Sequence, residues 1–174
     1  MLPIVKYPHP ILRTPAQEIS TISDELRTLA DEMYATMLAV RGIGLAAPQI
    51  GRSLRLIVVD VSKERNQRIT LFNPRITTQE GTGEGEEGCL SIPGVSATIK
   101  RTASVCASGL NSQGEIHEIK AEGLLAVCLQ HEIDHLNGVL FVDHLSRFKR
   151  ERLLGKYHKL QETNLKNNGT LPTQ

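Results

Sequence analysis

The chain has 174 residues, of which 40% are hydrophobic and 22% charged; this is the size of one domain and excludes a disordered or fibrous chain. Its formal net charge of +1 lacks the positive excess of a non-specific nucleic-acid binder, so we expect no DNA partner. The longest apolar run, 124–129, is far shorter than the roughly 20 residues that span a bilayer. An odd number of cysteines, three, argues against a disulfide framework.

The first predicted elements are a helix and a series of strands. Apolar residues recur at helical spacing over 23–40, behind a Ser23 cap, which predicts an amphipathic helix that stops near Gly42. Strand patterns follow at 54–61, 69–72, 95–99, 102–107 and 115–119. The stretch 81–88 alternates glycine with glutamate and is expected to be a flexible loop.

Two further helices are predicted in the last third of the chain. Segment 123–136 is apolar over most of its circumference, which places it in the core, and Gly138 follows its end. Ser146 is expected to cap a third helix. We therefore predict an α+β fold, with mostly antiparallel sheets packed around the buried helix 123–136 and a further helix near each end of the chain. A single domain over 1–162 and a polar, flexible tail over 163–174 are expected.

The strongest functional signal is the sequence HEIDH at 131–135, an H-E-x-x-H pattern on a predicted helix. Residues four apart lie on one face about one turn apart, so His131 and His135 can bind the same metal ion. Glu132 lies beside that ion without ligating it and can take a proton from a metal-bound water. The alternative is two unrelated core histidines, but such buried polar groups are costly unless they are paired or bound to metal.

A catalytic site of this type needs a third protein ligand and an open position for water. Phe141 stands where metzincin proteases have a third histidine, and Leu154 stands at the glutamate position of the gluzincin spacing. The remaining candidate is Cys89, in the glycine-rich sequence EGCLS upstream. Cys106 and Cys128 are interpreted as small buried residues.

A third motif, GIGLAAPQ, follows the first predicted helix and ends at Gln49, whose amide can donate to a developing oxyanion. Its two glycines lack the Lys-Ser/Thr pair and the preceding strand of a phosphate-binding loop. The motifs G-x-G-x-A-A-x-Q, E-G-C-L-S and H-E-x-D-H, in this order and in a chain of this length, resemble the peptide deformylase family.

This resemblance implies a metal-dependent hydrolase that removes the formyl group from the N-terminal formyl-methionine of new polypeptides and releases formate. The implied ligands of one divalent ion, Fe²⁺ in the cell with Zn²⁺, Ni²⁺ or Co²⁺ able to replace it, are Cys89, His131 and His135. A metal-bound water attacks the formyl carbon and Glu132 acts as general acid and base. The Gln49 amide and the Leu90 backbone N–H stabilise the oxyanion.

By the same resemblance, the methionine side chain enters an apolar pocket and the peptide backbone binds as an added strand. The implied substrate-binding residues are Ile43, Gly44, Gly88, Leu124, Val127 and Cys128. Gly85 stands where many members carry a larger apolar residue, which implies a looser pocket rim. Arg101 has two interpretations, a contact with substrate and a solvated residue at a strand end, and is left out of the predicted site.

The predicted partners are N-formylmethionyl nascent peptides, and we expect a monomer without membrane contact. The expected location is the cytoplasm of a bacterial-type cell, or an organelle stroma or matrix after removal of a transit peptide. The basic cluster 147–152 is interpreted as a solvated helix face, with a transient ribosome contact as the alternative. The histidines outside the motifs, expected at the surface, are His9, His117, His144 and His158.

Two rival functions are a metalloprotease and a catalytically silent relative that holds metal to complete its fold. The metalloprotease hypothesis lacks either usual downstream ligand. Glu132 and Gln49 argue against the silent relative, because neither ligates metal and a structural site would not require them.

Overall fold

The computed structural model describes residues 1–168. Its helices are α1 (Asp24–Ala39), α2 (Gly123–Leu136) and α3 (Arg147–Asn168), with short 3₁₀ helices η1 (Pro10–Arg13), η2 (Ala47–Ile50) and η3 (Phe141–His144). Its strands are β1 (Gly44–Ala46), β2 (Leu56–Val59), β3 (Ile69–Glu80), β4 (Gly83–Cys89), β5 (Ile92–Arg101), β6 (Ser104–Leu110) and β7 (Ile116–Glu122). The predicted α+β class, with a strand-rich middle between helices, is confirmed.

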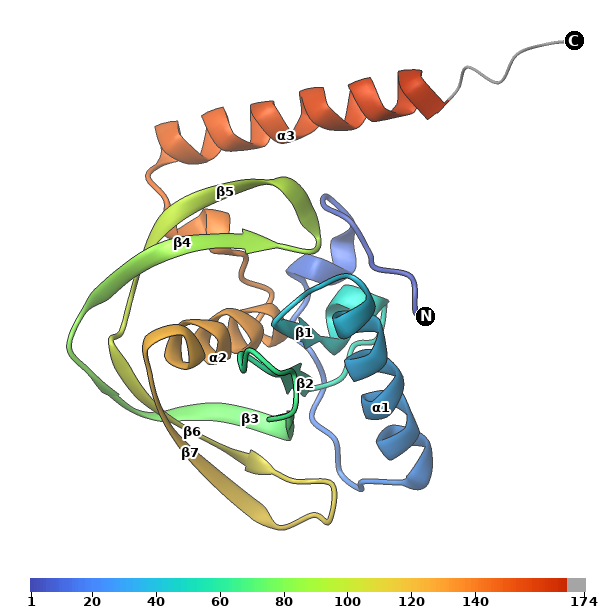
Figure 1. The fold of residues 1–174 in the computed structure, drawn as a ribbon, viewed down its shortest axis with the longest axis vertical. Helices are drawn as coiled ribbons and strands as arrows, with labels where there is room; N and C mark the ends of the chain where they lie inside the picture. The colour runs from blue at the N-terminus through green and yellow to red at the C-terminus, as the bar shows by residue number, and fades with distance from the viewer. Residues whose placement is uncertain (169–174) are drawn as a thin grey trace, which may run out of the picture.

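The strands form two antiparallel sheets, a five-stranded sheet in the order β1-β2-β3-β6-β7 and a two-stranded sheet of β4 and β5. Figure 1 shows α2 in the space between them, as the sequence predicts. On α2, Leu129 and Leu136 are fully buried and pack into one cluster with Ile57 and Leu71 of the larger sheet. The helix that carries both site histidines is therefore the centre of the core.

Helix α1 covers the opposite face of the larger sheet. Alternate residues of β2 point to opposite faces, and accordingly Ile57 packs with the cluster that contains α2, whereas Leu56 packs with Met33 of α1. The Ser23 side chain caps α1 by accepting a hydrogen bond from the Leu26 N–H at 3.4 Å. Burial of β2 on both sides explains its continuous run of apolar residues.

Helix α1 ends at Ala39, slightly before the predicted stop near Gly42. Arg41 takes a left-handed backbone conformation, with φ of 58°, and the Gly42 N–H bonds to the Met37 carbonyl at 2.8 Å. These contacts reverse the chain and lead it directly into β1. The helix end therefore fixes the position of the segment that carries Ile43 and Gly44.

The prediction of a flexible loop over 81–88 is wrong, because Gly83–Cys89 forms β4. It pairs with β5 from Gly83 opposite Arg101 to Gly88 opposite Ser96. Backbone hydrogen bonds do not require apolar side chains, and most β4 side chains are exposed or half-buried. The strand prediction depended on apolar alternation, which an exposed outer strand does not need.

Strand ends also differ from prediction. Strand β3 continues to Glu80, β5 spans Ile92–Arg101, and β6 runs over Ser104–Leu110 instead of 102–107. Register shifts interrupt the pairing of β3 with β6. The last residues of β3, 77–80, are polar and exposed, so they lack the apolar signal that locates a strand in the sequence.

Helix α3 follows Ser146, whose carbonyl accepts from the Arg150 N–H at 2.9 Å. It packs across β5 through buried Tyr157, whose hydroxyl donates to the Tyr7 carbonyl at 3.0 Å (Figure 1). The helix continues to Asn168, beyond its predicted end near 162, and the last six residues of the predicted tail lie outside the described residues. Within residues 1–168, no helix combines the length and apolarity needed to cross a membrane.

Candidate active site

Helix α2 and the end of β4 bring together the three predicted metal ligands. His131 and His135 lie one turn apart, with ring centroids separated by 5.0 Å. The Cys89 Sγ is 3.3 Å from the His135 Nε2, and the candidate ligand atoms of all three residues lie within 4.8 Å of one another. A register shift between Gly88 and Cys89 ends the regular pairing of β4 just where the thiol is presented.

The electrostatics of this cluster favour a thiolate. Burial raises the pKa of the Cys89 thiol, but the charge of His135 and hydrogen bonds with both histidines outweigh it and hold the pKa well below its ordinary value. Burial lowers the pKa of His131, yet its hydrogen bonds with Cys89 and Glu87 raise it well above its ordinary value. One thiolate and two imidazoles are a donor set that binds Zn²⁺, Fe²⁺ and similar divalent ions.

Glu87 orients the first histidine. Its Oε2 lies 2.9 Å from the His131 Nδ1, which leaves Nε2 as the ring nitrogen free to ligate a metal. Burial raises the pKa of Glu87, but hydrogen bonds from Arg101 and His131 lower it to about 2. The carboxylate therefore stays charged and fixes the ring orientation, as carboxylates beside metal-binding histidines commonly do.

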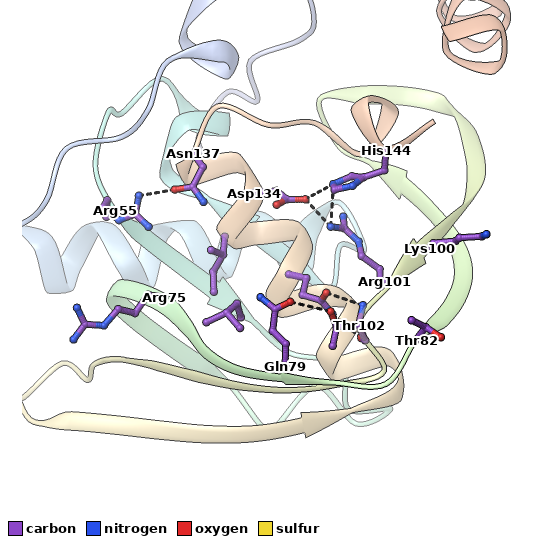
Figure 2. A pocket seen from close by; sticks show the side chains of 13 residues that line it. Arg55, Arg75, Gln79, Thr82, Lys100, Arg101, Thr102, Asp134, Asn137 and His144 are labelled. Carbon is purple, nitrogen blue, oxygen red and sulfur yellow. Dashed lines mark hydrogen bonds and ion pairs between the residues drawn. The ribbon is translucent and has the colours of Figure 1, made fainter. Parts of the chain in front are cut away.

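Arg101 supports Glu87 from behind, and neither interpretation from the sequence is right. Its Nε and Nη2 donate to the two Glu87 oxygens at 2.7 and 2.9 Å, and its Nη1 donates to Asp134 at 2.6 Å. Figure 2 shows Asp134 bonded to both Arg101 and His144, whose Nε2 lies 2.7 Å from the same carboxylate. Arg101 is only 7% exposed, so it is a buried structural partner. His144 is exposed, as the sequence predicts, and its ring bonds to this carboxylate.

Glu132 is placed for proton transfer. It is 4% exposed, and within residues 1–168 its Oε2 has no hydrogen-bond partner. Burial raises the pKa of Glu132, although the charges of His131 and His135 oppose this shift. An unpaired buried carboxylate oxygen is costly, so its position beside the Cys/His/His cluster fits a site that holds a metal ion and its water.

Gln49 and Leu90 lie on the other side of the cluster. The Gln49 side chain is fixed by its Oε1, which accepts from the Ala46 N–H at 2.9 Å, and its Nε2 points to the Cys89 Sγ at 3.5 Å and the Ser91 Oγ at 3.3 Å. Leu90 directly follows Cys89 in the chain. The predicted oxyanion donors are thus near the candidate metal ligands.

Most of the groups in direct contact with the cluster line a cavity of about 490 Å³, namely Gln49, Glu87, Cys89, Leu90, His131 and Glu132. His135 does not line it and is buried next to Cys89. Also among the residues that line the cavity are the six predicted substrate-binding residues, Ile43, Gly44, Gly88, Leu124, Val127 and Cys128. Gly85 does not line it, and a Cβ at that position would meet nothing within 4 Å. The predicted catalytic and substrate residues thus line one pocket together with Cys89 and His131, and His135 lies against Cys89.

A family model described as polypeptide deformylase matches residues 1–151. The chain belongs to the peptide deformylase family. It is 47% identical to the peptide deformylase of Acinetobacter baumannii over 92% of both chains, and 44% identical to that of Wolinella succinogenes over 95% of this chain and 100% of the relative.

Solved peptide deformylases share the fold. The crystal structure from Legionella pneumophila aligns with a TM-score of 0.86 at 47% identity, covering 93% of this chain and 98% of that one. The structure from Ehrlichia chaffeensis aligns with a TM-score of 0.88 at 37% identity, covering 95% and 99%. The protein is thus a metal-dependent hydrolase with peptide deformylase activity and a Cys/His/His metal site.

The prediction of the deformylase site missed Glu87 and the role of Arg101. Glu87 could have been found from its place in the sequence, two residues before Cys89. In the structure it is the buried residue of β4. Had 81–88 been recognised as a strand, alternation would have turned this carboxylate toward the core. A second missed residue is Lys6, which lines the pocket although it lies outside all three motifs.

Proposed function

We propose that the protein deformylates N-formylmethionyl nascent peptides with Glu132 as general acid and base. The observation that carries this proposal is the buried Glu132 Oε2, which lacks a partner within residues 1–168 and lies in the pocket of Cys89 and His131. When bound by Cys89, His131 and His135, a divalent ion supplies Lewis-acid chemistry, lowering the pKa of a water and polarising the formyl oxygen.

The proton route uses Glu132 alone. Its carboxylate takes a proton from the attacking water and delivers it to the amine nitrogen as the formyl C–N bond breaks, which yields formate and a free amine. The raised pKa of Glu132, caused by burial, suits a group that must act first as a base and then as an acid. The negative charge on the former formyl oxygen is stabilised by donation from the Gln49 Nε2 and the Leu90 N–H, where one such donor typically contributes about 10²–10³ in kcat.

The pocket also accounts for substrate binding. Leu124, Val127 and Cys128 offer apolar walls for the methionine side chain. Strands β1 and β4 are edges of different sheets, and Gly44 and Gly88 on them line the same cavity. A peptide that adds a strand at this gap gains main-chain hydrogen bonds, which tolerate sequence variation beyond the first residue.

The proposal also covers the metal ion, the location and the partners of the protein. We infer Fe²⁺ as the cellular ion, with Zn²⁺, Ni²⁺ or Co²⁺ as replacements, because thiolate and imidazole ligands accept all four. We also propose a cytoplasmic monomer. A transient ribosome contact through 147–152 is the alternative to a solvated face, and the exposed basic residues there are compatible with either.

The test measures formate release from formyl-Met-Ala-Ser by anaerobically prepared protein loaded with Fe²⁺, Ni²⁺ or Zn²⁺. Glu132→Gln should keep its metal and lose most activity, whereas Cys89→Ala should lose both. Glu84→Gln and Cys106→Ala are matched controls, because Glu84 is exposed and neither residue lines the pocket. Full activity of Glu132→Gln, or full metal occupancy of Cys89→Ala, would contradict the assigned roles.

A further inference from the structure

Two cationic residues outside the motifs stand at the entrance of the active-site pocket, Lys6 and Arg41. Both are exposed. Lys6 donates from Nζ to the Leu90 carbonyl at 2.6 Å, so its ammonium is held next to the residue that follows Cys89. Within residues 1–168, the Arg41 guanidinium forms no ion pair or side-chain hydrogen bond. Neither cation is neutralised by a carboxylate partner.

Lys6 and Arg41 both lie next to the contact between Leu90 and Gly42. Leu90, which holds Lys6, packs against Gly42, since a Cβ built on Gly42 would lie 2.9 Å from the Leu90 Cδ1. Arg41 directly precedes Gly42 and takes a left-handed backbone conformation with φ of 58°. A peptide that passes this contact therefore meets positive charge from the N-terminal segment and from the end of α1.

Three carboxylates also line the pocket, Glu86, Glu87 and Glu132. Glu87 is bound by Arg101 and His131, and Glu132 lies inside the site. Glu86 accepts a hydrogen bond from the Ser96 hydroxyl at 2.5 Å, on the side of β5. Of these carboxylates only Glu86 is exposed, and its bond to Ser96 places it beside β5. Lys6 and Arg41 are therefore the charged side chains next to the contact between Leu90 and Gly42.

The direction of the substrate chain brings its later residues to this rim. Gly44 packs directly against Glu132, so a peptide whose first residue reacts beside Glu132 pairs with β1 near Gly44. Beyond Gly44 in one direction, Leu45 and Ala46 are fully buried. The other direction leads towards Arg41, which is exposed and lies three residues before Gly44 in the chain.

We propose that Lys6 and Arg41 form a cationic subsite that favours an acidic side chain at the second or third residue of the formyl-methionyl peptide. This inference rests on the proposed binding of the peptide between β1 and β4. A carboxylate about 4 Å from one of these cations in water gains enough Coulomb energy for about a fivefold preference, and long-range attraction from the second cation adds to it at low salt.

The test compares kcat/KM for formyl-Met-Ala-Ser with peptides that carry Asp or Lys at the second or third position. We expect the wild-type enzyme to prefer one of the acidic peptides over the neutral peptide by about three- to tenfold at about 10 mM salt. The preference should vanish near 1 M salt, where the Debye length falls from about 30 Å to about 3 Å.

Arg41→Glu should reverse the order in favour of the lysine peptides, and Lys6→Met should reduce the acidic preference without reversing it. Arg75→Glu is the matched control, because Arg75 is exposed on β3 and does not line this pocket. Formate release from the neutral peptide by every variant tests the proposed function separately. Equal acidic-to-neutral ratios for wild type, Arg41→Glu and Arg75→Glu, or a preference that persists in 1 M salt, overturns the inference.

Discussion

Gly44 allows the edge of β1, where we propose that the substrate binds, to lie directly against α2. A Cβ at this position would overlap the Glu132 Oε1 and would lie 2.8 Å from the Cys128 Sγ. Comfortable contacts between such atoms are about 3.5–4.0 Å. Gly44→Ala therefore requires β1 and α2 to separate, or Glu132 to move, by about 1 Å.

This displacement converts into a large kinetic effect. Misplacement of a catalytic group by about 1 Å can cost about 10² in rate, so we expect kcat/KM of Gly44→Ala to fall by about 100-fold. Formate release from formyl-Met-Ala-Ser measures the loss. Bound metal per chain should stay near the wild-type value, because the atoms nearest to the added methyl group belong to Glu132 and Cys128 and not to a predicted metal ligand.

Gly85→Ala is the matched control on β4, since its added methyl group would meet nothing within 4 Å. We expect its activity to stay within about twofold of wild type, the range expected when no packing is disturbed. Comparable activity of Gly44→Ala and Gly85→Ala would refute the argument that close approach at Gly44 sets the position of Glu132.

Three further changes test other parts of the structure. Glu87→Gln removes the charged partner of the His131 Nδ1, so metal affinity in chelator competition should fall about 10–100-fold; unchanged affinity would exclude an orienting role. Leu129→Ala empties a fully buried core position of α2 and should cost about 2–5 kcal/mol in urea unfolding. Burial raises the pKa of Asp143, but the hydrogen bond from Arg13 outweighs it and lowers the pKa below its ordinary value. This carboxylate therefore stabilises the fold above about pH 4 and loses that effect as pH falls further, so an Asp143→Asn deficit of about 1 kcal/mol at pH 7 should shrink below pH 4.

Much of the fold could be predicted because its central elements carry strong signals in their local sequence. Helix α2 was predicted with its correct bounds, since its apolar circumference and the following Gly138 are strong local signals. Strand β4 was missed because its stability comes from backbone pairing with β5, a contact with no local signature. Strand β1 was missed as well, because three residues that include a glycine are too few to show an alternating pattern.

The candidate site was predicted from motifs in three separate segments, and the structure joins them in one pocket. What the motifs could not contain is the chain of partners behind the metal ligands. Arg101 and His144 meet through Asp134 only when β5, α2 and η3 come together. Such contacts depend on tertiary structure, and a single sequence does not show which distant residues become neighbours.

The glycine and glutamate residues of β4 affect the tendency of this protein to associate with other copies of itself. The open edge of β4, where we propose that a nascent peptide adds a strand, offers the same backbone groups to any other extended chain, which is a route to aggregation. Glu84 and Glu86 are exposed on β4, so two such edges that approach each other repel. A peptide that binds as proposed, with its methionine in the pocket, gains interactions that a second β4 edge lacks, so the two acidic residues discourage pairing between copies while they leave the edge open to substrate.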